Sequence, residues 1–312
     1  MSLSESSATG AILAAESLSK SFGRRQAVAD VSFEVLPGEV FGFLGPNGAG
    51  KTTTIRMLVG LARPDSGRVR IAGLDLHKDF ARAMRHVGCI VESPDLYRYL
   101  TGRENLRHFA RMLGDGAAGR IEELARLVAL EERLEEPVST YSLGMRQRLG
   151  IAQALLGSPD VLILDEPANG LDPAGIREIR HLIRRLASER GIAVFLSSHL
   201  LSEVEQTCDR VAIIHRGRTL ASGPVRELLA AAEAPLRVTA RPGARAAEIL
   251  AAFARQPPRL DGEDVVSAEV PRERVPEAVR ALSNGGVEIF SLERRAASLE
   301  EVFLEVTGGE TV

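Results

Sequence analysis

Among its 312 residues the chain has only two cysteines, Cys89 and Cys208. A disulfide framework or a zinc site is therefore not expected, whereas two buried thiols in a reducing compartment are. No excess of charge of one sign exists either, because 39 basic residues stand against 42 acidic ones for a formal net charge of -3. Such a balance argues against nucleic acid as a partner, which usually requires a broad basic face.

Long apolar runs are also absent. No stretch approaches the roughly 18 or more consecutive apolar residues that a membrane-spanning helix requires. The first residues, MSLSESSATG, have neither a basic start nor an apolar core, so a signal peptide is not expected. These absences predict a soluble, cytoplasmic chain, and any work at a membrane has to be done through a partner.

The sequence does contain a repeated alternation between short apolar runs and helical stripes, which indicates an α/β fold. From about Thr101 to Gly157 the pattern is helical, and Thr101 with Glu104 has the form of a capping box. We therefore expect a flexible segment at 1–11 and a parallel α/β domain at 12–232, with a helical insert at about 93–157. The strand-type runs of this domain are 40–44, 87–91, 161–164, 192–196 and 211–214.

The pattern of apolar residues in the sequence changes after about Glu233. Short strand-type runs alternate with helical stripes and predict a βαββαβ layer, in which residues 259–260 form a weak strand. We expect residues 233–312 to form a separate small α+β domain, with a ferredoxin-like arrangement as one candidate. Its last helix opens with a second capping box, Ser298 with Glu301. The side chains that this helix is expected to bury are Leu299, Val302, Phe303 and Val306.

A phosphate-binding loop is the strongest motif. Residues 45–52 have the sequence GPNGAGKT, which fits G-x-x-x-x-G-K-[ST] between an expected strand and an expected helix. Glycines let successive backbone N–H groups face one anion, and the helix start adds its positive dipole end. The alternative, a glycine-rich connection without a ligand, is disfavoured by the flanking elements. The predicted phosphate contacts of ATP are Asn47, Gly48, Ala49, Gly50, Lys51, Thr52 and Thr53.

Two strands end in residues that suit ATP hydrolysis. The run 161–164 ends in Asp165 and Glu166, and a strand beside the phosphate loop can deliver Asp165 to Mg²⁺, to which the Thr52 hydroxyl is also predicted to bind. Glu166 is the candidate general base. His199 follows the next strand and is expected at the same edge of the sheet. Taken alone, the carboxylates favour solvated charge and the histidine a structural role. Their position downstream of a phosphate loop reverses this for the carboxylates, and the role of the histidine depends on the motifs around it.

In this order the motifs resemble the nucleotide-binding subunit of an ABC transporter, from roughly Ile12 to Leu229. The resemblance implies a P-loop NTPase with a RecA-like core, an antiparallel β subdomain and an inserted helical subdomain. It also implies that two subunits pack head to tail, each ATP lying between one phosphate loop and the partner's signature segment. The roles it implies are adenine stacking by Phe22, a signature in trans made by Ser142, Gly144 and Met145, a D-loop with Asp172, and a catalytic switch role for His199 beside Glu166.

Four positions depart from the family pattern. Leu143 and Met145 replace a glycine and a glutamine of the signature, while the serine and the second glycine remain. Glu92 stands where the family usually has glutamine. A carboxylate there can still bind Mg²⁺, although it cannot donate a hydrogen bond as an amide does. Ala168 stands where threonine or serine is usual. We therefore expect a working site with Thr52, Glu92 and Asp165 as the metal ligands.

These variants are most similar to those of bacterial ATPases that serve ABC-2-type permeases, including bacitracin-resistance and other drug exporters. The resemblance implies a motor that uses MgATP, pairs with a second copy of itself or a related ATPase, and acts with a separate ABC-2-type integral membrane permease. It would export an antibiotic, drug, lipid or peptide from the inner face of the cell membrane. An importer-type ATPase and a non-transport ABC ATPase remain alternatives. A GTPase is disfavoured because no Asn-Lys-x-Asp segment is present.

The same resemblance places the permease in a groove lined by residues 92–100. Tyr97 and Tyr99 lie in this segment and suit a contact surface, because tyrosine brings area at little entropic cost. Packing of the two tyrosines inside the helical insert is an equally open alternative.

Overall fold

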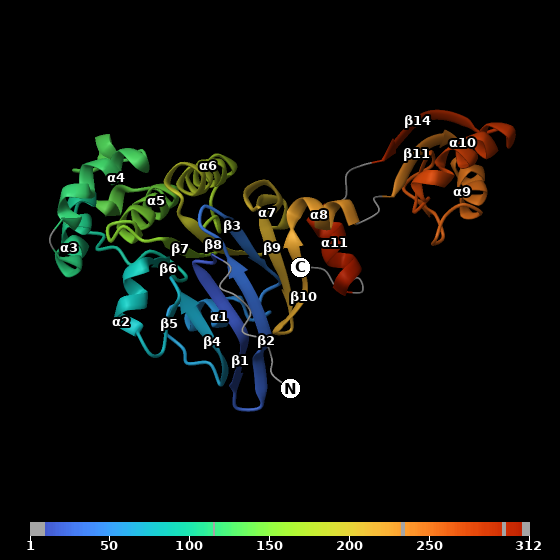
Figure 1. Cartoon of the computed structure of the whole chain (residues 1–312). Helices are drawn as coiled ribbons and strands as arrows, with labels where there is room; N and C mark the ends of the chain where they lie inside the picture. Colours follow the sequence, from blue (N-terminus) through green and yellow to red (C-terminus); the bar gives the residue numbers. More distant parts are fainter. Residues whose placement is uncertain (1–9, 115, 232–234, 295–297, 308–312) are drawn as a thin grey trace, which may run out of the picture. The chain divides into compact units, whose positions relative to one another are not determined.

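The computed structural model describes residues 10–114, 116–231, 235–294 and 298–307, apart from the side chains of residues 231 and 305 (Figure 1). The predicted flexible segment 1–11 therefore falls almost wholly outside the described residues, and the predicted domain boundary at 232–233 falls outside them as well. The chain divides into two compact units, one running to Val225 and the other spanning Arg226–Glu305.

A six-stranded sheet forms the core of the first unit. All its strands pair in parallel except the edge strand β10, which is antiparallel to β9. The predicted runs become strands because a parallel sheet is buried on both faces, so its strands are continuously apolar. The order is β10-β9-β3-β8-β7-β6, with bounds Arg218–Pro224, Arg210–His215, Val40–Leu44, Ala193–Ser198, Val161–Asp165 and Val87–Ile90.

The order of the strands in this sheet differs from their order along the chain. β8 lies between β7, which ends in Asp165, and β3, which precedes the phosphate loop. Because parallel strands are joined by crossovers, their order along the chain does not give their order in the sheet. The carboxyl ends of β3, β8 and β7 nevertheless all lie at one edge of the sheet, because the three strands are parallel.

An antiparallel sheet covers the core sheet through an aromatic cluster. Its order is β2-β1-β4-β5, with bounds Arg25–Val35, Leu13–Phe22, Ser66–Ile71 and Leu74–Asp75. Phe33 of β2 stacks on Phe41 of β3 and Phe195 of β8, with ring centroids 5.4 and 5.2 Å apart. Aromatic pairs at this spacing add to the free energy of apolar burial. The cluster therefore fixes the two sheets where the phosphate loop begins.

Helices make up the rest of this unit. The helical insert contains α3, α4 and α5 (green in Figure 1), with bounds Gly102–Leu113, Ile121–Leu127 and Leu143–Ala154. The capping box at Thr101 and Glu104 is confirmed, since each residue's side chain accepts the other's backbone N–H. The remaining helices are α1, α2, α6 and α7, with bounds Lys51–Leu58, Phe80–Ala83, Pro173–Arg190 and Leu201–Thr207. Single 3₁₀ turns lie at 84–86, 117–120, 131–133 and 138–140.

The second unit contains an antiparallel sheet in the order β12-β13-β11-β14. Its elements follow the predicted βαββαβ order, as β11 Leu236–Arg241, α9 Gly243–Ala251, β12 Arg259–Leu260, β13 Val265–Ala268, α10 Val275–Asn284 and β14 Glu288–Arg294. A 3₁₀ turn occupies 272–274, and the helices α8 and α11 span Val225–Ala231 and Leu299–Thr307. The Ser298–Glu301 capping box is confirmed. Val306 is 37% exposed, so its predicted burial is wrong.

Both cysteines are free thiols, as predicted, although only Cys208 is fully buried and Cys89 is partly exposed. Burial raises the pKa of both thiols, since the thiolate loses its hydration. Because the thiolate is the reactive form, Cys208 in the folded chain should react with iodoacetamide at pH 8 at least about tenfold more slowly than in urea, with Cys89 intermediate. Timed alkylation followed by peptide mass spectrometry measures this, and equal rates for Cys208 in both solvents would contradict its burial.

No helix in the part of the chain that the structure describes combines the length and apolar character needed to span a membrane.

Candidate active site

The phosphate loop joins β3 to α1, and α1 begins at Lys51 as predicted. Gly50 caps the helix with φ of 109°, a conformation that L side chains rarely adopt, and a Cβ there would lie 2.5 Å from the carbonyl oxygen of Ala27. A Cβ at Gly45 would lie 2.2 Å from the carbonyl oxygen of Ile214. Gly45 and Gly50 are therefore required by close backbone approaches, whereas Gly48 is favoured by its φ of 79°.

The Lys51 ammonium is buried in the loop. It donates to the carbonyl oxygens of Gly45 at 2.7 Å and Pro46 at 3.3 Å, and it lies 3.2 Å from Oε1 of Glu166. A buried ammonium is stable only when its three N–H donors have partners, and these contacts supply them. Lysine and carboxylate thus meet over the loop, although 115 positions separate them in the sequence.

Asp165 and Glu166 point to different partners at the end of β7. The Asp165 carboxylate is 2% exposed and accepts a hydrogen bond from the Ser197 hydroxyl at 2.5 Å. The Glu166 backbone N–H donates to the same hydroxyl at 3.0 Å. Glu166 has φ of 49°, in the left-handed region that non-glycine residues seldom occupy. Such backbone conformations are concentrated at functional sites, which is consistent with a working role for this carboxylate.

His199 meets Glu166 at the edge of the sheet, as its position after β8 predicts. Its Nδ1 atom lies 2.8 Å from Oε2 of Glu166, and its backbone N–H donates to the same oxygen at 3.4 Å. The two oxygens of Glu166 therefore face Lys51 and His199 respectively. This three-residue arrangement fits a group that orients and deprotonates water next to a bound phosphate.

Sequence reasoning did not assign a role to Ser197, whose hydroxyl bridges Asp165 and Glu166. The signal that could have found it is the parallel register, in which Asp165 of β7 stands opposite Ser197 of β8. A polar residue at that point of a buried strand has to find a hydrogen-bond partner.

A cleft of about 340 Å³ opens over the phosphate loop. Phe22 is 56% exposed at its rim, as an aromatic that stacks on a base has to be. Of the predicted phosphate-contact residues, Ala49 does not line the cleft, and its side chain is buried. The residues lining the cleft are Phe22, Arg25, Ala27, Asn47, Gly48, Gly50, Lys51, Thr52, Thr53 and Glu166.

The signature and D-loop residues lie outside this cleft. Ser142 caps α5 and accepts the backbone N–H of Met145 at 3.2 Å, while Asp172 caps α6 and accepts that of Gly175 at 2.8 Å. Ser142 and Asp172 are exposed, and none of the signature residues lines the cleft. One chain therefore brings together the phosphate loop, Glu166 and His199 but not the signature.

Glu92 is not brought to the phosphate loop. Its exposed carboxylate accepts a hydrogen bond from Arg56 of α1 at 2.5 Å, and its backbone has φ of 67°. Within the described residues no three His, Cys, Asp or Glu side chains gather as a metal cage. Oxygen donors from one hydroxyl, one or two carboxylates and a substrate's phosphates are nevertheless the set that Mg²⁺ prefers.

Comparison with known proteins shows which family the chain belongs to. Residues 28–169 match the model of the ABC transporter family. The chain is 45% identical over 297 residues, 95% of its own length and 96% of the relative's, to the uncharacterized ABC transporter ATP-binding protein YhcH of Bacillus subtilis. The chain belongs to the ABC transporter ATP-binding proteins. It is therefore a member of an ATP-hydrolysing family, and its P-loop NTPase fold is confirmed.

Two further relatives of this ABC ATPase are informative. It is 49% identical over 213 residues to the bacitracin transport ATP-binding protein BcrA of Bacillus licheniformis, covering 68% of this chain and 70% of BcrA. A solved ATP-binding subunit of an ABC transporter superposes with a TM-score of 0.63 at 34% identity, covering 70% of this chain and 92% of the other. The predicted resemblance to antibiotic-exporter ATPases is confirmed.

Proposed function

We propose that the chain is the motor subunit of an ABC-2-type exporter, in which MgATP binding and hydrolysis by a dimer drive efflux through a separate membrane permease. The observation that carries the proposal is the placement of Glu166 between Lys51 and His199, at 3.2 and 2.8 Å, beside an open cleft. It puts a base, an orienting group and a phosphate-binding cation within reach of one another.

The chain's own residues divide the work of hydrolysis. Backbone N–H groups of the phosphate loop and the Lys51 ammonium hold the terminal phosphates of ATP, and Phe22 stacks on the adenine. Glu166 takes a proton from the attacking water, and His199 orients that water and the γ-phosphate. The Ser197 hydroxyl holds both carboxylates in place, since it contacts Asp165 and the backbone of Glu166.

Magnesium is the ion that this oxygen-rich edge fits. Thr52 lines the cleft and supplies a hydroxyl, and Asp165 supplies a buried carboxylate whose only hydrogen bond among the described residues comes from Ser197. Glu92 joins as a ligand only if it leaves Arg56. When bound, the ion would neutralise phosphate charge, and Thr52 and Asp165 would hold it.

A second copy of the chain completes the site. Ser142, Gly144 and Met145 lie outside the cleft that holds the phosphate loop, so a bound nucleotide needs them from another chain. One sequence supplies every part, which favours a homodimer over pairing with a related ATPase. ATP closes this interface and hydrolysis reopens it, a two-state element biased by the γ-phosphate.

The permease is proposed to bind a second cavity, of about 380 Å³, which is lined by Glu92, Pro94 and Leu96 and also by Leu143 and Glu166. Tyr99 is 77% exposed nearby, whereas Tyr97 packs edge-on against His108 of α3 with ring centroids 5.0 Å apart. The exposure of Tyr99 thus favours a contact surface, whereas the packing of Tyr97 favours a place inside the helical insert. Tyr99 is the aromatic anchor that the docking surface offers.

Efflux of an antibiotic, drug, lipid or peptide is favoured because one relative whose name gives a cargo, BcrA, is a bacitracin transport protein. Location at the inner face of the cell membrane follows from attachment to the permease. The second unit supports the assembly structurally in this proposal.

The test is capture of the tagged chain from detergent-solubilised membranes of its own cell, followed by mass spectrometry. The expected partner is a polypeptide with several spanning segments, recovered at least about fivefold less with Tyr99→Ala. Phe80→Ala, which removes another exposed aromatic, is the matched control and should recover the partner normally. Recovery of ribosomal or DNA-repair proteins in place of a membrane protein would favour the non-transport alternative.

A further inference from the structure

Helix α7 begins two residues after His199, and few interactions within its own sequence stabilise it. It has seven residues, no side-chain hydrogen bond at its N-cap Leu200, and three buried residues, Leu201, Val204 and Thr207. An isolated helix of this length is not stable in water, so tertiary contacts decide where it lies. The position of His199, two residues before α7, therefore depends on what holds the helix.

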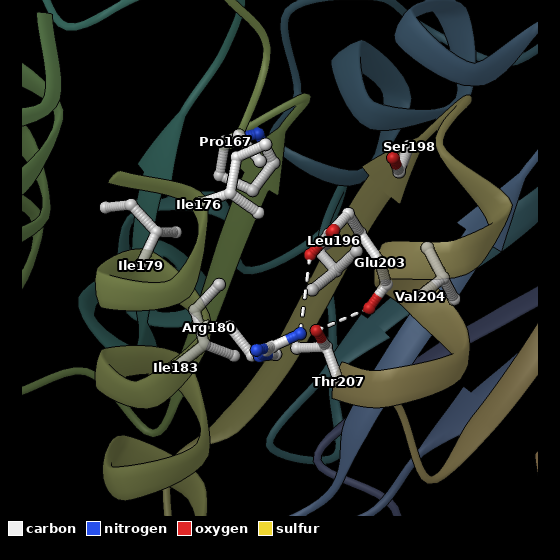
Figure 2. A pocket seen from close by; sticks show the side chains of 11 residues that line it. Pro167, Ile176, Ile179, Arg180, Ile183, Leu196, Ser198, Glu203, Val204 and Thr207 are labelled. Atoms are coloured by element: carbon white, nitrogen blue, oxygen red, sulfur yellow. Dashed lines mark hydrogen bonds and ion pairs between the residues drawn. The ribbon is translucent and has the colours of Figure 1, made fainter. Parts of the chain in front are cut away.

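Apolar packing between α7 and α6 is incomplete. A cavity of about 30 Å³ remains between them, enough for about one water molecule. Figure 2 shows it enclosed by Ile176, Ile179 and Ile183 of α6 and by Leu196 and Val204. Pro167, which directly follows Glu166, also lines the cavity, as does Ser198, which directly precedes His199. The cavity thus lies behind the two groups that act on ATP.

Arg180 crosses this cavity from α6 to α7. Its Nη1 atom lies 3.7 Å from Oε2 of Glu203 (Figure 2). The same atom also donates to Oε1 of Gln206, one turn further along α7. Glu203 Oε2 is a buried atom without a hydrogen bond in the described structure, so the ion pair with Arg180 is what compensates its charge there.

Arg184 lies one turn further along α6 and forms hydrogen bonds at the C-terminal end of α7. It donates to the carbonyl oxygen of Thr207 at 3.2 Å and to Oδ1 of Asp209 at 2.7 Å. Asp209 Oδ2 in turn accepts the backbone N–H of Val40, the first residue of β3, at 2.9 Å. An arginine at the last carbonyls of a helix is favourable in hydrogen bonding and in charge.

We infer that Arg180 and Arg184, here named the arginine clasp, are positioning residues that hold α7 so that His199 stays against Glu166. The inference rests on the proposed role of His199. Because α6 begins directly after Asp172, the clasp ties the D-loop, the switch histidine and the strand before the phosphate loop to one helix. The clasp does not touch ATP; it acts through His199.

The first test uses kinetics in two backgrounds. Arg180→Ala should lower kcat about five- to tenfold with the KM for ATP within about twofold, and Arg180→Lys should restore part of the loss. In a His199→Ala background the same substitution should cause no further loss, since the group it positions is gone. Equal losses in both backgrounds would overturn the inference. Full activity of His199→Ala alone would instead remove the proposed role of His199.

The second test does not depend on activity. In a histidine-labelled chain, which has six histidines, the ring signal lost in His199→Ala should move in Arg180→Ala. Arg190→Ala is the matched control, because Arg190 is also an arginine of α6 but pairs with Glu123 of α4. The His199 signal should stay in place in that variant. An unmoved His199 signal in folded Arg180→Ala, or an equal movement in both variants, would refute the clasp as a positioning device.

Discussion

Replacing Glu166 by glutamine should lower ATP turnover at least about a hundredfold while ATP binding stays within a few-fold of normal. Glutamine keeps the size of the side chain and an oxygen that can face Lys51 or His199, so the loop geometry is retained. It cannot accept a proton from water. Steady-state phosphate release and fluorescent-nucleotide titration, made on the same preparation, separate the two effects.

Glu189→Gln is the matched control for this substitution, because Glu189 is an exposed carboxylate at the end of α6. It should turn over ATP normally. Unimpaired hydrolysis by Glu166→Gln would remove Glu166 from the role of base, whatever its distance from His199.

Replacing Lys51 by methionine should raise the Kd for ATP at least about a hundredfold, because a buried cation that pairs with phosphate contributes several kcal/mol to binding. Methionine also has an unbranched side chain, so it can occupy the space that the lysine side chain leaves. The carbonyl oxygens of Gly45 and Pro46 lose a donor, so a modest fall in the melting temperature is expected as well.

Lys78→Met controls for the loss of a positive charge, since Lys78 is exposed and lies outside the cleft. Equilibrium dialysis with labelled ATP measures binding without requiring turnover. Nucleotide binding by a folded Lys51→Met chain at the normal Kd would contradict the assignment of the phosphate loop.

Much of the fold could be predicted because its signals are local. Buried parallel strands such as 40–44 and 161–165 are continuous apolar runs, and the capping boxes at Thr101 and Ser298 mark helix starts by residue type alone. The order of strands in the sheet could not be predicted, since the insertion of β8 between β3 and β7 depends on crossovers rather than on pattern.

The candidate site shows the same division. The phosphate loop is contiguous, so its residues and its helix start at Lys51 could be named in advance. Contacts across the sheet could not. The bridging role of Ser197 depends on register, and the pairing of Glu92 with Arg56 depends on where two unrelated segments meet. The clasp on α7 likewise joins residues of two helices at positions that no short motif relates.

Light scattering of the Glu166→Gln chain tests the composite site most directly. With MgATP, blocked hydrolysis should trap a particle of twice the 33.6 kDa of one chain. The same chain with ADP, or with Ser142 also replaced by arginine, should remain at the mass of one chain. A single-chain mass under saturating MgATP would contradict the completion of each ATP site by the signature of a second copy.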